Sequence, residues 1–301
     1  MEAPVVVGVD GSDGSLRALD WAVDEAVRHG RALRIVHASP WERYEGAAPD
    51  ASTERPAGRV EAEKLVGGAE DRARRRAPGL AVKGEVTSEE ATGALLREGQ
   101  EAMLVVVGSR GRSELGDLLL GSVGLVVAAR AHGPVVVVRG DASGLESHHA
   151  RVVLGVGDHD LDSPAVRFAF REAAVRDAAL DVVRAWRRPA HDPVDHPLIR
   201  GETGLVLEQR ASKALDEALE AAASEYPQVR IHRNTVEGTA RRVLTERSAT
   251  ADLLVVGARR SGRLLGLELG RVAHRALHHA SCPVAVVPMH RTTAHGERAP
   301  M

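Results

Sequence analysis

Three glycines and a serine follow an apolar run at a spacing that suits the binding of phosphate groups. The run LVVVG ends at Gly108, a second glycine stands at Gly111, and Gly121 and Ser122 follow after nine further residues. Glycine has no Cβ, so its backbone can adopt positive φ or approach a ligand closely. Ser122 is predicted to be the N-cap of a helix over VGLVVAARA, whose first N–H groups and dipole attract anions. The spacing therefore predicts a phosphate-binding loop that needs no lysine.

Each fragment of this pattern also has a purely structural interpretation. Glycines are common where strands end, and Gly-Ser before a helix is often only a turn and a cap. The full pattern, Gly-x2-Gly-x9-Gly-Ser between a Val-rich strand and a helix, is more specific than any of its parts. Two interpretations stay open at this point: a nucleotide site, or a loop whose glycines are architectural.

The elements that must position this loop are present twice in the chain. PVVVGVDG at 4–11 is echoed by RVVLGVGD at 151–158, and GPVVVV at 133–138 is echoed by CPVAVV at 282–287. The offset between matching residues changes only from 147 to 149 along the chain. The chain therefore contains two copies of one domain with few insertions between them.

Composition places the boundaries of the two copies. The segment at 140–150 is rich in Gly, Ser and His without an apolar period, so it is predicted to be a linker. The polar residues after Pro288 are predicted to be disordered. The predicted organisation is a first domain at 1–140, a linker at 141–150, a second domain at 151–290 and a disordered tail at 291–301.

Each copy alternates apolar strands with helices. Several strands are continuous Val/Leu runs, which is typical of strands buried on both faces of a parallel sheet. The pattern predicts an α/β fold with two tandem Rossmann-like domains, each a five-stranded parallel sheet with helices on both faces. The predicted strands are 4–9, 32–38, 80–86, 103–108 and 134–139 in the first copy, and 151–156, 180–186, 229–236, 252–257 and 283–288 in the second.

The glycine loop falls where such a sheet binds ligands. Asp10 and Gly108 end the first and fourth strands, which flank the switch point of an open α/β sheet. In that setting GSRGRSELGDLLLGS after LVVVG, VVVGVDGSDGS at 5–15 and HASP at 37–40 resemble the universal stress protein family and its ATP-binding signature. The resemblance covers almost the whole chain as a tandem pair, and the signature is complete only in the first copy.

The resemblance implies a role for each matching residue. Asp10 would face the ribose or the adenine with Val9 beside it, and the backbone of Ala38 would contact the adenine edge. The glycine loop would wrap the ribose and the first phosphates, and the helix start would bind the distal phosphates. ATP would bring a divalent metal, Mg²⁺, without a dedicated metal ligand from the protein. The loop and helix residues are Gly108, Arg110, Gly111, Gly121, Ser122 and Val123.

The second copy departs from the signature. A bulky arginine replaces a glycine where close approach to the ligand is needed, and the cap hydroxyl is lost. We therefore expect the second domain to bind ATP weakly or not at all and to serve as a structural or dimerisation half. The replacements are Arg260 for Gly111, Arg271 for Ser122 and Gly157 for Asp10, although Asp158 is adjacent to Gly157.

An alternative for the second copy also stays open. Arg259, Arg260 and Arg271 could form a different anion site, since arginine pairs well with phosphate. In the simpler interpretation, which we favour from the sequence, these arginines are solvated or paired with acids such as Glu268.

Composition excludes several other classes of function. Forty basic and forty-two acidic residues give a formal net charge of -2, which favours neither nucleic acid nor a membrane surface as a partner. The sequence has no signal-peptide pattern and no apolar run long enough to span a membrane, so a cytoplasmic location is expected. A single cysteine, Cys282, excludes a disulfide framework and a Cys-based metal site.

The sequence favours a regulatory protein of the stress response over an enzyme. No general base is evident in the signature, so no catalytic residue is predicted and any ATP hydrolysis should be slow. A slow nucleotide hydrolase on a related fold and a structural protein without nucleotide remain the alternatives. The last strands, GPVVVV and CPVAVV, resemble edge strands through which such domains pair, and they could join the two halves or two chains of a homodimer.

Overall fold

The computed structural model describes residues 2–40, 57–109, 121–140, 145, 148–157, 163–187, 197–259 and 269–289. Within this part, each sequence copy contributes five strands, and each strand begins and ends within two residues of its predicted bounds. The strands of the first copy are β1 (Val5–Gly8), β2 (Leu33–Ala38), β3 (Val82–Thr87), β4 (Leu104–Gly108) and β5 (Val135–Val138). Those of the second are β6 (Arg151–Gly155), β7 (Ala179–Trp186), β8 (Ile231–Glu237), β9 (Leu253–Arg259) and β10 (Val284–Met289).

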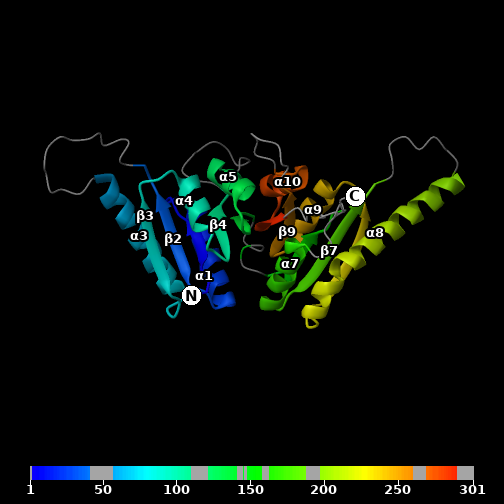
Figure 1. The fold of residues 1–301 in the computed structure, drawn as a ribbon, viewed down its shortest axis with the longest axis horizontal. Helices are drawn as coiled ribbons and strands as arrows, with labels where there is room; N and C mark the ends of the chain where they lie inside the picture. Colours follow the sequence, from blue (N-terminus) through cyan, green and yellow to red (C-terminus); the bar gives the residue numbers. More distant parts are fainter. Residues whose placement is uncertain are drawn as a thin grey trace, which may run out of the picture.

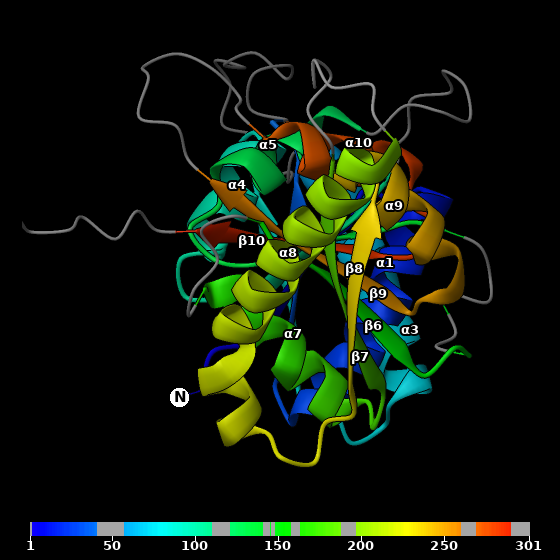
Figure 2. The ribbon, with the colours of Figure 1, turned by 90° about the vertical axis from the view of Figure 1, so that its right-hand side faces the viewer.

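Helices cover both faces of the sheet. They are α1 (Asp13–His29), α3 (Ala57–Arg76), α4 (Ala91–Glu98), α5 (Ser122–Arg130), α7 (Pro164–Val175), α8 (Pro197–Glu225), α9 (Ala240–Arg247) and α10 (Arg271–His279), with a 3₁₀ turn at Ser248–Thr250. In Figure 1, α5 and α10 lie above the sheet and α1 and α7 lie below it. Figure 2 shows α8 running along β7 and β8.

The apolar runs of the strands supply two hydrophobic layers. Val5 and Val7 belong to the layer that also contains residues of α1, α3, α7 and α8, and Val6 belongs to the layer on the other face with residues of α4, α5, α9 and α10. All three side chains are fully buried. Because successive strand residues point to opposite faces, a strand covered on both sides must be apolar at every position. The predicted α/β architecture is confirmed.

The two copies join through their last strands into a single sheet. The strand order is β3-β2-β1-β4-β5-β10-β9-β6-β7-β8, parallel within each copy. At the junction β5 and β10 are antiparallel, with Val136 opposite Ala285. The last strands thus join the two halves of one chain, one of the two possibilities predicted from the sequence. A homodimer through the same edges would have to open this pairing.

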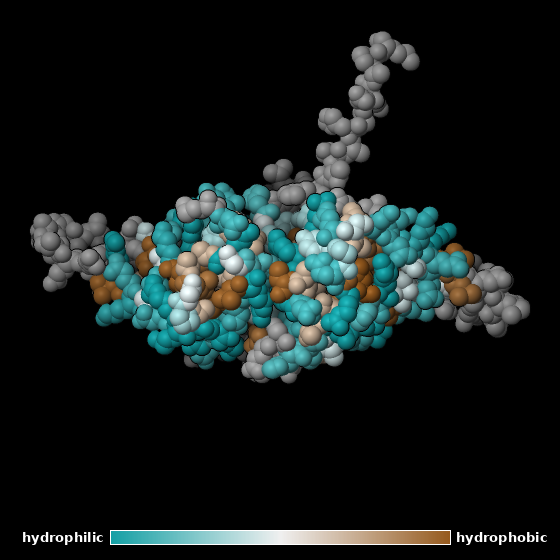
Figure 3. Space-filling view, turned by 90° about the horizontal axis from the view of Figure 1, so that it is seen from below, coloured by the Kyte–Doolittle hydropathy of each residue, from teal (hydrophilic) through white to brown (hydrophobic). Residues whose placement is uncertain are grey.

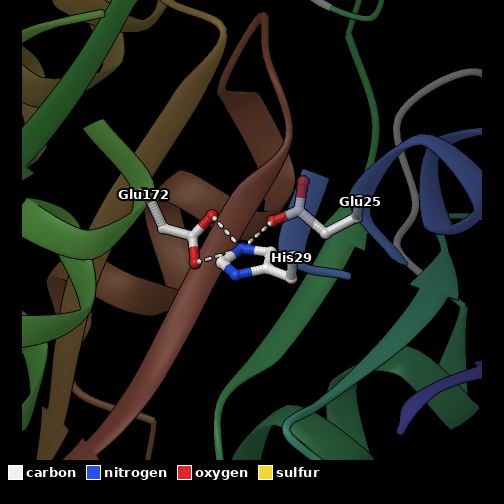
Figure 4. A group of neighbouring side chains, drawn as sticks. All are labelled: Glu25, His29 and Glu172. Atoms are coloured by element: carbon white, nitrogen blue, oxygen red, sulfur yellow. Dashed lines mark hydrogen bonds and ion pairs between the residues drawn. The ribbon is translucent and has the colours of Figure 1, made fainter. Parts of the chain in front are cut away.

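A four-residue buried charge cluster, Glu25 and His29 of α1 with Glu172 and Arg176 of α7, connects the two copies below the sheet. Arg176 Nη2 donates to Glu25 Oε2 at 2.6 Å and Nη1 contacts the Glu172 carboxylate. His29 Nε2 lies 3.3 Å from an oxygen of each carboxylate, so the imidazole sits between them (Figure 4). The four side chains are at most 5% exposed. Two carboxylates face two cations, so the ionised cluster is neutral.

The charges of this cluster depend strongly on one another. Burial would lower the pKa of His29, but hydrogen bonds to Glu172 and Glu25 outweigh it and raise the pKa to about 9. Burial would raise the pKa of Glu25, but Arg176 outweighs it and the pKa is lowered. The pKa of Glu172 is raised by burial and by the neighbouring Glu25 charge. The proton on His29 is therefore part of the contact between the copies.

The same cluster contains a donor set that could hold a metal ion, formed by Glu25, His29 and Glu172. A divalent cation there would replace the His29 proton and add a net positive charge beside the buried Arg176. Arg28 and Arg171 lie at the rim of the cluster and add further positive charge. Burying uncompensated charge is costly, so the cluster is better explained as an ion-pair contact between α1 and α7.

The outer surface and the chain ends complete the description. Figure 3, which shows the molecule from below, has hydrophobic residues in small groups among hydrophilic ones. Among the described helices, none combines the length and the apolar character that a membrane span requires. The predicted tail at 291–301 lies outside the described residues, as does most of the predicted linker at 141–150.

The first prediction concerns Gly140, which follows β5 at the junction of the copies. Its φ is 108°, and a Cβ there would lie 2.1 Å from the carbonyl oxygen of Ser281. We expect Gly140→Ala to lower the free energy of unfolding by about 2 kcal/mol, measured by urea denaturation. Gly67→Ala in α3 is the control, since a Cβ there meets no atom within 4 Å and alanine favours a helix. An equal, small effect of both substitutions would contradict the junction geometry.

The second prediction concerns the charge cluster. Since the pKa of His29 is raised to about 9 in the fold, its contribution is fully present below its unfolded pKa of about 6.5 and is lost as pH rises through 9. We expect the free energy of unfolding to fall by about 2 kcal/mol over this range in the unmodified protein. The His29→Gln protein should lack this pH-dependent fall in the free energy of unfolding. Parallel pH profiles of the two proteins would show that His29 is not protonated in the cluster.

Candidate functional site

A pocket of about 290 Å³ lies at the carboxyl ends of β1 and β4. The chain leaves these neighbouring strands toward opposite sides of the sheet, so the pocket is at the switch point of the first copy. Strand ends, the start of α1, helix α4 and the first turn of α5 all contribute to it. Its lining residues are Gly8, Val9, Asp10, Ser15, Val36, Ala38, Ala91, Leu95, Val107, Gly108, Gly121, Ser122, Val123 and Gly124.

The pocket brings together most of the residues that the sequence singled out. They come from four separate segments of the chain, yet they line one cavity. Arg110 and Gly111 lie outside the described residues. The predicted residues in the lining are Val9, Asp10, Ala38, Gly108, Gly121, Ser122 and Val123.

The start of helix α5 differs from its predicted form. The prediction that Ser122 is the N-cap is wrong: Gly121 is the N-cap, with extended backbone, and Ser122 is the first helical residue. The N–H of Gly121 donates to the carbonyl of Ser109 at 2.8 Å, which ties the helix start to the end of β4. No side chain caps the helix, so its first-turn N–H groups are available to an anion in the pocket.

Asp10 is held in place by the turn that starts α1. Its Oδ1 accepts hydrogen bonds from the Ser12 N–H at 3.0 Å and from Ser12 Oγ at 2.6 Å. Ser12 in turn caps α1 by accepting from the N–H of Ser15. Gly11, with a φ of 82°, permits this turn. The carboxylate is therefore fixed at the pocket wall, where it can accept hydrogen bonds from a ligand.

Gly108 has an architectural role in addition to its place in the pocket. A Cβ at this position would lie 2.6 Å from the carbonyl oxygen of Gly14, in the first turn of α1. Any side chain here would push α1 away from the sheet. The structural interpretation of this glycine is thus correct, and it is compatible with a ligand site.

Sequence reasoning missed three contributors to the site. His37, at the end of β2, is buried and its Nδ1 donates to the carbonyl of Val9 at 2.7 Å, which fixes the end of β1. Leu95 of α4 forms an apolar wall and Ser15 a polar one. The only sequence signals were HASP at 37–40 and the apolar period of α4, and neither specifies a pocket.

The second copy has a pocket in the equivalent place with different chemistry. It measures about 520 Å³ and lies at the carboxyl ends of β6 and β9. Gly157 stands where the first copy has Asp10, and its carbonyl accepts from Arg184 at 2.7 Å. Arg271 is the first residue of α10, after the N-cap Gly270. Arg260 and Glu268 lie outside the described residues.

Comparison with known proteins identifies relatives over nearly the whole chain. The model of the universal stress protein family matches residues 1–139 and 149–288. A universal stress protein of Mycolicibacterium smegmatis is 32% identical over 294 residues, covering 95% of this chain and 97% of that protein. A solved universal stress protein from Archaeoglobus fulgidus shares the fold at 16% identity, with a TM-score of 0.63 over 95% of this chain and 98% of that one. A solved universal stress protein in complex with cAMP is 32% identical, covers 46% of this chain and 96% of its own, and has a TM-score of 0.35.

Proposed function

Because this chain belongs to the universal stress protein family, we propose that its first copy binds an adenine nucleotide, ATP, in the pocket between β1 and β4. One observation carries the proposal: residues from four distant segments, chosen from the sequence for nucleotide chemistry, line a single cavity at the switch point of the sheet. The proposed domains are 1–140 and 151–290.

The pocket offers a different environment to each part of the nucleotide. Val36, Leu95 and Val107 form an apolar wall for the adenine, and the carboxylate of Asp10 suits the ribose hydroxyls. The uncapped start of α5 suits phosphate oxygens. By their resemblance to the family signature, Arg110 and Gly111, which lie outside the described residues, are proposed to contact the ribose and the first phosphates. In this proposal the phosphates lie at the start of α5 and the base lies near β2.

A metal ion would reach this site with the nucleotide. Asp10 is the only carboxylate among the described lining residues, and its Oδ1 already accepts two hydrogen bonds from Ser12. Mg²⁺ prefers oxygen ligands and keeps several waters, so the phosphates and water would supply most of its coordination. The protein residues present are consistent with this arrangement.

The proposed role is regulatory. Among the described residues of the pocket, Asp10 is the only titratable side chain, and it is engaged in the turn before α1. Among the described lining residues no other side chain could act as a general base, so we expect ATP to be hydrolysed slowly. Bound nucleotide would instead shift an equilibrium between conformations or oligomers. Turnover far above background with excess ATP would favour the enzyme alternative.

The third prediction tests the phosphate end of the pocket. We expect Gly121→Asp to weaken ATP binding at least about 100-fold, because a carboxylate would face the phosphates. The fold should persist, since the extended backbone of Gly121 suits aspartate as an N-cap. Isothermal titration calorimetry with Mg²⁺-ATP measures the affinity.

Gly270→Asp is the matched control, because Gly270 holds the same N-cap position in the second copy. It should leave the affinity of the first pocket unchanged. Unaltered ATP binding by a folded Gly121→Asp protein would contradict the proposed phosphate position.

A further inference from the structure

The pocket of the second copy opens onto a surface rich in arginine. Two hollows of about 250 and 380 Å³ adjoin it. The 250 Å³ hollow shares Arg271 with the pocket and Arg241 with the 380 Å³ hollow. The pocket and the two hollows therefore form one continuous surface. The arginines that line it, here called the arginine rim, are Arg187, Arg241, Arg242, Arg271 and Arg275.

The arginine rim sits where positive charge is already concentrated. Arg241 and Arg242 lie in the first turn of α9, and Arg271 is the first residue of α10. Basic residues at a helix N-terminus oppose the helix dipole and destabilise the helix. Neither helix has an acidic residue in its first turn to compensate. These arginines therefore do not stabilise the helices that carry them, and their fields add to those of the helix ends.

Among the described residues, most arginines of the rim have no acidic partner. Arg242 pairs with Glu246 at 3.1 Å. For Arg187, Arg241, Arg271 and Arg275, no ion pair with a carboxylate is found within the described part of the chain. All are exposed. By contrast, Arg72 and Arg76 of α3 each form two short hydrogen bonds to an aspartate of α1.

The first copy has no arginine at the positions equivalent to the arginine rim. The positions equivalent to the rim, taken from the aligned strands and helices, hold neutral residues. No described residue that lines the first pocket is basic. The second pocket also loses the carboxylate of Asp10 and has no acidic residue in its described lining. The neutral equivalents are Pro40, Thr92, Gly93, Ser122 and Val126.

The described linings of the two pockets therefore differ in charge: the first has one carboxylate and no basic residue, and the second has an arginine and no acidic residue. We propose that the second pocket and its arginine rim bind a small polyanion, a ligand that carries several linked phosphate groups. Guanidinium groups recognise phosphate by paired hydrogen bonds, and several of them attract a chain of charges more strongly than a single phosphate. The described lining of the second pocket lacks the carboxylate that would select a ribose in the first, so we expect charge and not the nucleoside to determine the ligand. This proposal does not depend on ATP binding by the first copy.

The test uses inorganic tripolyphosphate as the probe and the full chain with Gly121→Asp as the background. This background places a carboxylate at the N-cap of α5, where the first pocket would bind phosphates. We expect calorimetry to show one tripolyphosphate per chain, bound at least about 10-fold more tightly than orthophosphate. Binding should weaken as salt is raised from about 50 to 200 mM.

Substitutions toward the first copy locate the site. Arg241→Thr with Arg271→Ser replaces two exposed rim residues by their first-copy equivalents and should weaken tripolyphosphate binding at least about 10-fold. The control, Arg72→Ala with Arg76→Ala, removes two positive charges from α3, away from the rim, and should leave the affinity for tripolyphosphate unchanged. Thermal unfolding checks that both double variants fold.

Three results would overturn the proposal: no tripolyphosphate binding, equal affinity for tripolyphosphate and orthophosphate, or equal losses in the two double variants. Binding in the unmodified protein that disappears with Gly121→Asp would assign the phosphates to the first pocket and would also overturn it. Failure of the ATP proposal leaves this test intact, because the substitutions in the arginine rim, and not the Gly121→Asp background, locate the tripolyphosphate.

Discussion

The antiparallel pairing of β5 with β10 is the contact on which the rest of the molecule depends. It turns two five-stranded sheets into one and covers the edge of each last strand. It also brings α1 of one copy against α7 of the other, so that Glu25 and Glu172 share Arg176 and His29. The switch points stay away from this junction, between β1 and β4 and between β6 and β9. Each copy can therefore change its pocket without disturbing the contact that holds the two together.

Repetition of one domain has allowed the two pockets to diverge. The strands and the glycine N-caps of α5 and α10 are kept in both copies. The residues around the pocket openings differ: the first copy has a carboxylate without described basic neighbours, and the second has arginines at two helix starts. The strands are buried, whereas the arginines around the opening of the second pocket are exposed. Substitutions at such exposed positions cost little stability. From the sequence we favour a structural role for the second copy and leave an anion site at its arginines open. The exposed arginine rim is the observation that supports the anion site.

The strands and the fold class could be predicted because buried parallel strands leave continuous Val and Leu runs, whereas the pairing of the last strands came from a resemblance that left two halves or two chains open. The convergence of Asp10, Ala38 and Gly121 followed from their positions at strand ends and at a helix start. The N-cap of α5 could not be predicted, because the contact of Gly121 with Ser109 fixes it. The packing role of Gly108 depends on Gly14, far away in the sequence. The charge cluster also escaped prediction, since its halves meet only after the copies dock.

The most direct measurement of the central claim is the amount of adenine nucleotide retained by the chain. The protein would be saturated with Mg²⁺-ATP, passed through gel filtration at high salt to screen the arginine rim, denatured, and the released nucleotide quantified by chromatography. The account predicts one adenine nucleotide per chain, held by the pocket between β1 and β4. Release of no nucleotide from folded protein would contradict it and would leave the glycines of that pocket with an architectural role alone.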